Sequence, residues 1–315
     1  MEKITIHLKH CRIENPENVV NFHFSDNQYE LRFSSESFDV GKGVVVSSLS
    51  DVSIDQELLG WLSVFFGEDF TEPFQKMDTR NSSNRGNFEV DEKLLQKFLN
   101  AASRSANRVS PKWKKSLLDD VLRYYIVGLR SGLSMMPLTL GFFGLSMECV
   151  GNLVSNQKTK YHMLGSFAFN KLINKRFDRH KKNPKHRDNF RRWQKFINAD
   201  SIMIHAIRNA VYGHSMLHLR EERKKIVSLL REWLIRGGAN KKTAIFWFKP
   251  DRLELDLQVM AAPLYKVGLR SSRLLIFMLL GFSSSIPFAE NDYLPIGRRI
   301  PNEPMKFNDM TIMLS

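Results

Sequence analysis

A charged, helix-forming segment in the second half of the chain sets the strongest constraint on its fold. Residues 201–236 read SIMIHAIRNAVYGHSMLHLREERKKIVSLLREWLIR, and Gly237 and Gly238 follow. In the later part of the segment, apolar residues recur at steps of three and four positions, which predicts a helix with one apolar side. Paired glycines directly after such a run predict the end of the helix.

An arginine and a histidine lie six positions apart in this segment. Arg208 is a permanent cation whose planar guanidinium suits a phosphate, and His214 offers an acceptor nitrogen and changes its charge close to neutral pH. A fixed cation beside a titrating base is the combination that phosphodiester cleavage requires. On a straight helix, residues six positions apart point about 120° away from each other. We therefore expect the length of the arginine, or a break at Gly213, to bring the two groups together.

The stretch from Arg208 to His214, with Asn209 directly after the arginine, resembles the Arg-x(4–6)-His motif of HEPN domains. Proteins of this family are helical bundles, and many are metal-independent ribonucleases of toxin and antiviral systems. Over residues 113–236 the resemblance implies such a bundle, cleavage of RNA, and a homodimer whose two motifs meet in one cleft. An antitoxin or another defence-system protein is the further partner that it implies.

Three residues carry the chemistry in this interpretation: Arg208 holds the phosphate, His214 acts as base or acid, and Asn209 bonds the phosphate or fixes the imidazole tautomer. Tyr212 either stacks on a base or is structural. His218 lies four positions after His214, on the same side of a helix, and is a second candidate base. The sequence shows no zinc-binding set around these histidines, so we expect no metal and no cofactor.

An uncharged stretch, residues 131–147, precedes the motif. It is shorter than the roughly 20 residues of a membrane span and it includes Pro137, so a buried core helix is the preferred interpretation and a membrane helix the alternative. The residues from Phe142 to Glu148 resemble the phenylalanine-to-glutamate segment on an early helix of Apea-like HEPN proteins. We expect Glu148 either to face Arg208 and orient it, or to lie solvated at the end of its helix.

Positive charge concentrates just before the motif. Residues 171–195 contain eleven Lys and Arg residues against two Asp residues, a net charge of +9 within the +14 of the whole chain. This density of cations, interleaved with aromatic residues, predicts a surface that binds the phosphates of a polyanion. A solvated loop whose aromatic residues pack inward is the alternative. The residues expected to contact RNA are Arg179, Lys181, Lys182, Lys185, Arg187, Arg191 and Arg192.

The first part of the chain, residues 1–75, is predicted to be β-rich, because apolar and polar residues alternate in several runs. Ser25-Asp26-Asn27 is a candidate hairpin turn between two of these runs, and Val44-Val45-Val46 a candidate further strand. No catalytic set is visible here. The histidines and Cys11 in this part lack metal-ligand spacing.

The pattern changes between residues 76 and 111. Polar stretches at residues 76–90 and 103–111 flank a short helix predicted over residues 92–102, and we expect a domain boundary there. Residues 113–129 are then predicted to be helical. After the motif, residues 244–248 are predicted to be a strand or a packing segment, residues 251–260 a strand, and residues 270–282 an apolar helix.

These patterns predict an α+β protein. We expect a β-rich N-terminal module over residues 1–100, a mainly α-helical HEPN-like bundle over residues 101–240 and a small C-terminal extension of strand and helix over residues 241–315. With 43% hydrophobic and 25% charged residues the composition is that of a folded protein. The two cysteines, and an N-terminus without the apolar core of a signal peptide, favour the cytoplasm.

The expected activity is that of an endoribonuclease of the HEPN type, in antiviral defence or as a toxin. The first alternative is a non-catalytic RNA-binding or scaffold protein on the same bundle. A basic protein at a membrane surface, using residues 131–147, is the second alternative. The pI near 9.8 fits all three, because nucleic acids and membrane surfaces are both polyanionic, but we expect RNA and not a membrane as the partner.

Overall fold

The chain folds into two compact units, one mainly of Met1–Ser110 and one mainly of Pro111–Ile286. The division falls after residue 110 instead of residue 100, and the helices after residue 240 belong to the second unit instead of forming a separate extension. The structure is a computed structural model, and it describes residues 3–7, 11–13, 19–38, 41–50, 52–67, 69–71, 86–88, 92–109, 111–155, 172, 200–213, 220–236 and 239–281. Within these ranges the strands all lie in the first unit and the second is helical, so the predicted α+β class is confirmed.

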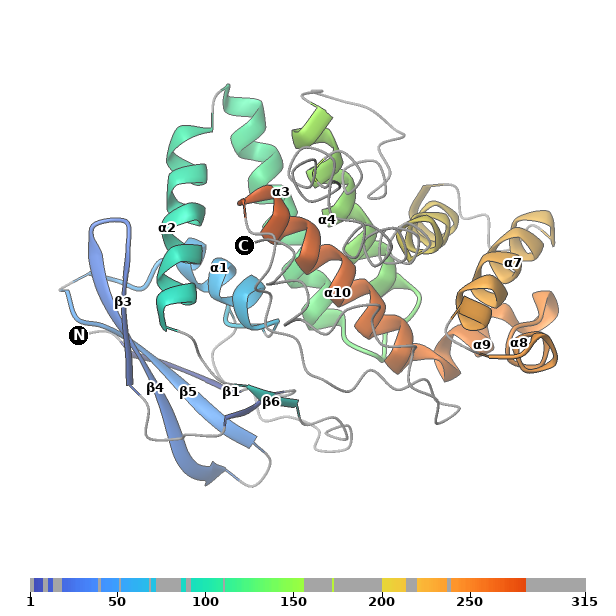
Figure 1. The fold of residues 1–315 in the computed structure, drawn as a ribbon, viewed down its shortest axis with the longest axis horizontal. Helices are drawn as coiled ribbons and strands as arrows, with labels where there is room; N and C mark the ends of the chain where they lie inside the picture. The colour runs from blue at the N-terminus through green and yellow to red at the C-terminus, as the bar shows by residue number, and fades with distance from the viewer. Residues whose placement is uncertain are drawn as a thin grey trace, which may run out of the picture. The chain divides into compact units, whose positions relative to one another are not determined.

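The first unit contains a four-stranded antiparallel sheet, in the order β1-β5-β4-β3, and a separate parallel pair of β2 and β6 (Figure 1). Val20, Phe22 and Phe24 of β3 are buried and alternate with exposed neighbours, because successive side chains of a strand point to opposite faces. A turn at Ser25 and Asp26, with Ser25 at φ 54°, joins β3 to β4. The predicted strands and hairpin are therefore confirmed. The strands are β1 (Lys3–His7), β2 (Cys11–Ile13), β3 (Val19–Phe24), β4 (Asn27–Phe38), β5 (Gly41–Ser48) and β6 (Gly86–Phe88).

Two helices accompany this sheet, α1 (Gln56–Phe66) and α2 (Glu92–Arg108). The first lies inside the part predicted to be β-rich, so that prediction is wrong for α1. Every residue of α1 from Leu58 onward is buried, so the helix has no polar side and no periodic signal. The second begins where predicted but passes through the expected break at residues 103–111 as far as Arg108, because Ala106 continues its buried side.

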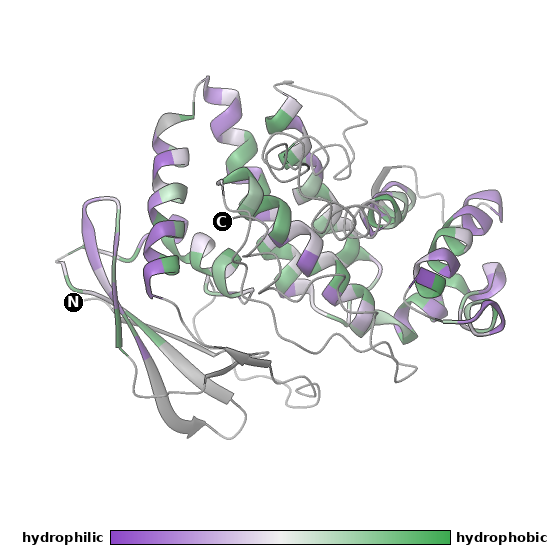
Figure 2. Cartoon of the chain, viewed as in Figure 1, coloured by the Kyte–Doolittle hydropathy of each residue, from purple (hydrophilic) through white to green (hydrophobic). Residues whose placement is uncertain are grey.

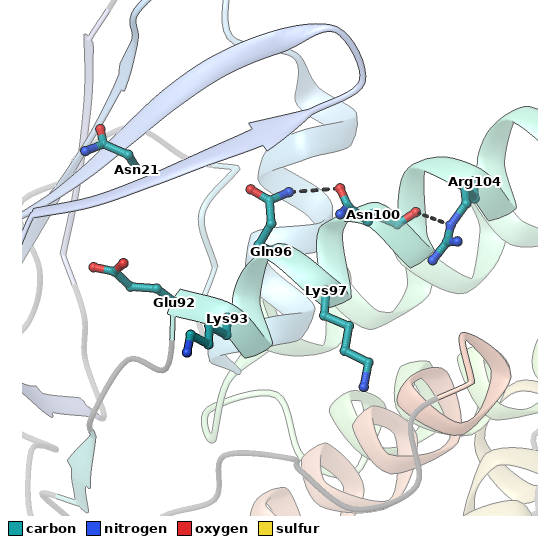
Figure 3. A pocket seen from close by; sticks show the side chains of 7 residues that line it. All are labelled: Asn21, Glu92, Lys93, Gln96, Lys97, Asn100 and Arg104. Carbon is teal, nitrogen blue, oxygen red and sulfur yellow. Dashed lines mark hydrogen bonds between the residues drawn. The ribbon is translucent and has the colours of Figure 1, made fainter.

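Gln96 of α2 bonds the outer edge of β3. Its Oε1 accepts from the His23 N–H at 2.7 Å, and its Nε2 donates to the His23 carbonyl at 2.9 Å and to Asn100 Oδ1 at 2.8 Å. The side-chain amide of Gln96 thus makes, at His23, the two backbone hydrogen bonds that a further strand would make. Gln96 also lines an open pocket of about 480 Å³ whose other lining residues are Asn21, Glu92, Lys93, Lys97, Asn100 and Arg104 (Figure 3).

The second unit is built around α3, α4 and α10, which pack against one another (Figure 1). The helices predicted over residues 113–129, in the later part of residues 201–236, and over residues 270–282 are confirmed as α3, α7 and α10, although α10 begins earlier, at Ala261. The elements in this unit are α3 (Lys112–Ser131), α4 (Leu138–Ser155), a helix over residues 200–208, η3 (Asn209–Gly213), α7 (Arg220–Arg236), α8 (Lys241–Trp247), η5 (Pro250–Arg252), α9 (Leu253–Val259) and α10 (Ala261–Leu279).

The uncharged stretch of the sequence contributes most of α4, in which hydrophobic residues dominate (Figure 2). By length and composition alone α4 is able to cross a membrane, and it is the one such helix among the described residues. Two thirds of it, 67%, is buried inside the fold, as in the core helix that the sequence predicts.

Phe143 of α4 fills the centre of the three-helix packing. Its ring is fully buried, lies 6.0 Å from the ring of Tyr125 on α3 and 5.7 Å from that of Tyr265 on α10. Glycines face it from both neighbouring helices. A Cβ atom at Gly128 would lie 2.7 Å from Phe143 Cε1, and a Cβ atom at Gly268 would lie 2.6 Å from Phe143 Cδ2. The three helices therefore approach one another around a single aromatic ring.

The strand predicted over residues 251–260 is wrong, because most of this segment forms α9. Residues 244–248, predicted as a strand or a packing segment, are not a strand either and lie mostly in α8. Leu253, Leu255, Leu257 and Val259 alternate with polar residues, but only Leu253 and Leu257 are buried, while Leu255 and Val259 are 57% and 56% exposed. The buried pair is four positions apart, which is the spacing of one helical face. Arg231 of α7 donates from Nε (3.0 Å) and Nη2 (2.7 Å) to the carbonyl of Phe248, directly after α8.

We predict that Gly128→Ala and Gly268→Ala each destabilise the protein by about 1–3 kcal/mol, since the new methyl group overpacks against Phe143. In an exposed helix the same change stabilises by about 1 kcal/mol, so the sign of the effect is diagnostic. Urea unfolding followed by the helical circular-dichroism signal measures it. Ser228→Ala on the exposed side of α7 is the control, and Phe143→Leu is expected to restore part of the loss. A gain in stability at either glycine would contradict this packing.

Candidate functional site

The helix over residues 200–208 lies directly against α4 at a glycine. A Cβ atom at Gly144 would be 3.0 Å from Arg208 Cβ and 3.3 Å from Ile204 Cγ2, closer than most side-chain contacts. A larger residue at this position would push the two helices apart. The glycine therefore allows the backbone that carries Arg208 to approach α4.

One turn after Gly144, Glu148 forms an ion pair with Arg208. The carboxylate Oε2 of Glu148 contacts Nη2 of Arg208, and the two side chains are 12% and 17% exposed. Glu148 lies in the middle of α4, not at its end, and is 9% exposed as a residue. Of the two positions considered for Glu148, the structure shows the one facing Arg208, and the solvated position at a helix end is wrong.

Arg208 extends this pair into a chain of hydrogen bonds. Its Nη1 donates to Asn209 Oδ1 at 2.7 Å, and Asn209 Nδ2 lies 2.9 Å from His205 Nε2. Because arginine only donates, the amide oxygen of Asn209 must face Arg208 and its NH₂ group must face the imidazole. His205 Nε2 is then the acceptor, which fixes the neutral tautomer with its proton on Nδ1.

His205 was not among the sequence-predicted site residues. It lies three positions before Arg208 and four before Asn209, which is the spacing of one helical face. This spacing is the feature of the sequence from which His205 could have been predicted. The structure thus assembles Glu148, Arg208, Asn209 and His205 as one network, hereafter the Arg208 network.

The backbone changes its helical form directly after Arg208. Residues 209–213 form the π-helical turn η3, in which hydrogen bonds reach five residues back instead of four. Such turns are rare and often occur at functional sites. The straight-helix angle between Arg208 and His214 therefore does not apply, and Gly213, the expected break, is the last residue of η3.

Several predicted site residues lie outside the described residues. These are His214, His218 and the side chain of Tyr212, whose backbone belongs to η3. The expected RNA-contacting residues also lie outside them: Arg179, Lys181, Lys182, Lys185, Arg187, Arg191 and Arg192. Their positions relative to the Arg208 network remain predictions of the sequence.

Two further titratable side chains experience the charge of Arg208. Burial raises the pKa of the Cys149 thiol to about 12, Asp120 and Glu148 add to the rise, and Arg208 opposes it. Burial also raises the pKa of Tyr124, with Asp120 and Cys149 adding to the rise and Arg123 and Arg208 opposing it. Both groups therefore stay protonated near neutral pH, so Cys149 does not supply a thiolate nucleophile.

A second buried ion pair fixes the start of the same helix. Arg270 Nη2 of α10 lies 3.0 Å from Asp200 Oδ2, and the two side chains are 13% and 1% exposed. Asp200 is the first described residue of the helix over residues 200–208. The helix is therefore held to α10 at one end and to α4 at the other.

Within the described ranges, no group of three or more His, Cys, Asp or Glu side chains is placed to hold a metal ion. Comparisons of the chain with protein-family models, with curated proteins and with solved structures found no match. The function is therefore inferred from the residues themselves. The Arg208 network is a place where charged and titratable side chains from two helices meet beside the predicted motif.

We predict that Glu148→Gln destabilises the protein by about 3 kcal/mol, because it leaves the largely buried Arg208 without an anionic partner. The double variant Glu148→Gln/Arg208→Gln is expected to lose less than the sum of the two single variants, since no uncompensated charge remains. Urea unfolding measures both. Glu232→Gln, which breaks the exposed pair with Arg236, is the control and should change stability by less than about 0.5 kcal/mol. Equal effects of Glu148→Gln and Glu232→Gln would contradict a coupled buried pair.

Proposed function

We propose that this chain is an endoribonuclease of the HEPN type that cleaves RNA without a metal ion, through attack of the 2′-hydroxyl on the adjacent phosphorus. The Arg208 network is the observation that supports this most strongly: a guanidinium is oriented by Glu148 and bonded to the residue that begins the π-helical turn leading to His214. Antiviral defence or toxicity in the cytoplasm is the proposed role.

Internal cleavage of RNA requires a base for the 2′-hydroxyl, an acid for the leaving 5′-oxygen and positive charge at the phosphoryl oxygens. In the proposal, His214 supplies the proton transfers, with His218 as the second candidate, and Arg208 holds the phosphate. Arginine has five N–H donors, and the described contacts use Nη1 and Nη2 while Nε makes no hydrogen bond. The oriented guanidinium therefore keeps donors for a phosphate.

Glu148 also has a disadvantage for this chemistry, because it weakens the attraction between Arg208 and a phosphate. Because its carboxylate neutralises Arg208, the pair attracts a phosphate less than a lone arginine would. The proposal assigns the missing attraction to the basic residues at 171–195, whose net charge is +9. Orientation then comes from the Arg208 network, and affinity from the basic segment.

The neutralised arginine is also the observation that favours the second candidate, a non-catalytic RNA-binding or scaffold protein on the same bundle. In that case Glu148 and Arg208 hold two helices together and the basic segment alone contacts RNA. Both candidate proteins bind RNA, but only the ribonuclease cleaves it. For the ribonuclease we further propose a homodimer that brings two motifs into one cleft, and control by an antitoxin or another defence-system protein.

We predict that the purified protein cleaves single-stranded RNA in excess EDTA and leaves DNA of the same base sequence uncut, because internal attack needs the 2′-hydroxyl. His214→Ala should lower cleavage at least about 100-fold with an unchanged helical circular-dichroism signal. Arg208→Lys should lower it by about 100-fold, since an ammonium cannot replace a planar fork. Arg270→Lys is the matched control, because it alters the other buried ion pair of the same helix and should retain activity.

Inhibition by EDTA, or equal cutting of DNA, would contradict the proposed mechanism. Equal loss of activity in Arg208→Lys and Arg270→Lys would make Arg208 a structural residue. Tight binding of RNA with no cleavage by the wild-type protein would favour the scaffold instead.

The basic segment gives a separate prediction. Lys181→Glu, Lys182→Glu and Lys185→Glu together should weaken RNA binding for all base sequences and reduce the slope of log Kd against log salt by about 2, at about 0.7 for each lost phosphate contact. Binding titrations at several salt concentrations measure the slope. A control of equal charge change is Lys115→Glu with Lys241→Glu and Lys242→Glu, all on exposed helix surfaces. An equal reduction in both triple variants would mean that net charge, and not this segment, attracts the RNA.

A further inference from the structure

Arg208 and Asn152 each have a buried polar atom without a hydrogen-bond partner. One is a donor, Nε of Arg208, and the other is an acceptor, Oδ1 of Asn152 on α4. Asn152 is 8% exposed, and no group in the described part of the chain donates a hydrogen bond to this oxygen. Buried polar groups are almost always paired, and an unpaired one destabilises the folded state. An orphaned donor and an orphaned acceptor near one network indicate a ligand that supplies both partners.

Asn152 lies one helical turn after Glu148 on α4, and so on the same side of the helix, about 6 Å further along its axis. Glu148 in turn contacts Arg208, whose Cβ and Cγ lie beside Gly144, one turn earlier. The guanidinium thus extends along α4 toward Asn152. The hydrogen bond from Ser155 Oγ goes to the backbone carbonyl of Asn152 and leaves the side-chain oxygen unused.

The orphaned donor suits an anionic oxygen, and the orphaned acceptor suits a hydroxyl group. An RNA strand presents this pair at every step, because each phosphate is followed on its 3′ side by a ribose with a 2′-hydroxyl. The ribose on the 5′ side carries the hydroxyl that attacks, and this group must stay available to the base. The hydroxyl on the 3′ side takes no part in the reaction and is free to donate.

We propose that Asn152 is a specificity residue that accepts a hydrogen bond from the 2′-hydroxyl of the nucleotide on the 3′ side of the phosphate held by Arg208. RNA as the substrate class rests on the proposed function; the acceptor subsite rests on the orphaned oxygen of Asn152. The subsite distinguishes ribose from deoxyribose at a position where the cleavage chemistry does not.

Two DNA strands with embedded ribonucleotides separate this subsite from the chemistry. The first strand contains two adjacent riboses, and the second contains only the 5′ ribose of that pair. Both retain the attacking hydroxyl at the same phosphate, so a difference in kcat/KM reports the 3′ ribose alone. The wild-type protein should cut the two-ribose strand about tenfold faster, the value expected for one buried hydrogen bond.

Asn152→Leu, which has a similar shape and no acceptor, should cut the two strands at equal rates. Its melting temperature should equal or exceed that of the wild type, because an unpaired buried oxygen is removed. Asn152→Asp keeps an acceptor at the same place and should retain the preference for the two-ribose strand, although its charge slows the cutting of both strands. The ratio of rates, and not either rate alone, is therefore the readout.

A preference that survives in Asn152→Leu, or that is absent in the wild type, overturns the assignment while leaving the proposed cleavage intact. If the wild-type protein binds both strands without cutting either, the ratio of their dissociation constants in wild type and Asn152→Leu decides the inference in the same way. If neither strand binds, the assignment of Asn152 is overturned, and cleavage of all-ribose RNA decides the proposed function separately.

Discussion

A buried carboxylate and a buried guanidinium are each unfavourable alone, and the pairing of Glu148 with Arg208 offsets part of that cost for both. The pair is possible only because Gly144 lets the helix over residues 200–208 approach α4. Once Arg208 is fixed, its remaining donors orient Asn209, and Asn209 selects the tautomer of His205. The ion pair between Glu148 and Arg208 thus also determines the positions of the Asn209 and His205 side chains.

The rest of the second unit fixes the two helices that supply this pair. Phe143, packed between glycines of α3 and α10, sets the position of α4 one turn before Met147 and Glu148. The ion pair between Asp200 and Arg270 fixes the other helix to α10. Core packing and the candidate site are therefore coupled: a shift of the Phe143 ring would move α4 and, with it, the guanidinium of Arg208.

Local patterns predicted much of the fold, but not the interactions that depend on its three-dimensional arrangement. Alternation identified β3 and β4, and apolar periodicity identified α3 and α7, because these elements have one buried and one exposed side. An apolar run identified α10, in which residues 271–278 are all buried. The same rules fail for α1, which is buried all round, and for α9, in which two of the four alternating apolar residues are buried and two are exposed. The contact of Glu148 with Arg208 was one of two alternatives at the sequence level. His205 and Asn152 became visible only when the structure showed a hydrogen bond and an orphaned oxygen.

Glu148 presents a compromise: it orients Arg208 and also weakens its attraction for a phosphate. A centre of this kind suits a reaction in which position matters more than binding strength, as in internal attack by a 2′-hydroxyl. The chemical identity of the product ends tests this claim most directly. Mass spectrometry of the cleaved RNA should show a 2′,3′-cyclic phosphate, or the phosphate from its opening, on one fragment and a 5′-hydroxyl on the other. A 3′-hydroxyl with a 5′-phosphate would mean that water attacks the phosphorus, and would contradict the account.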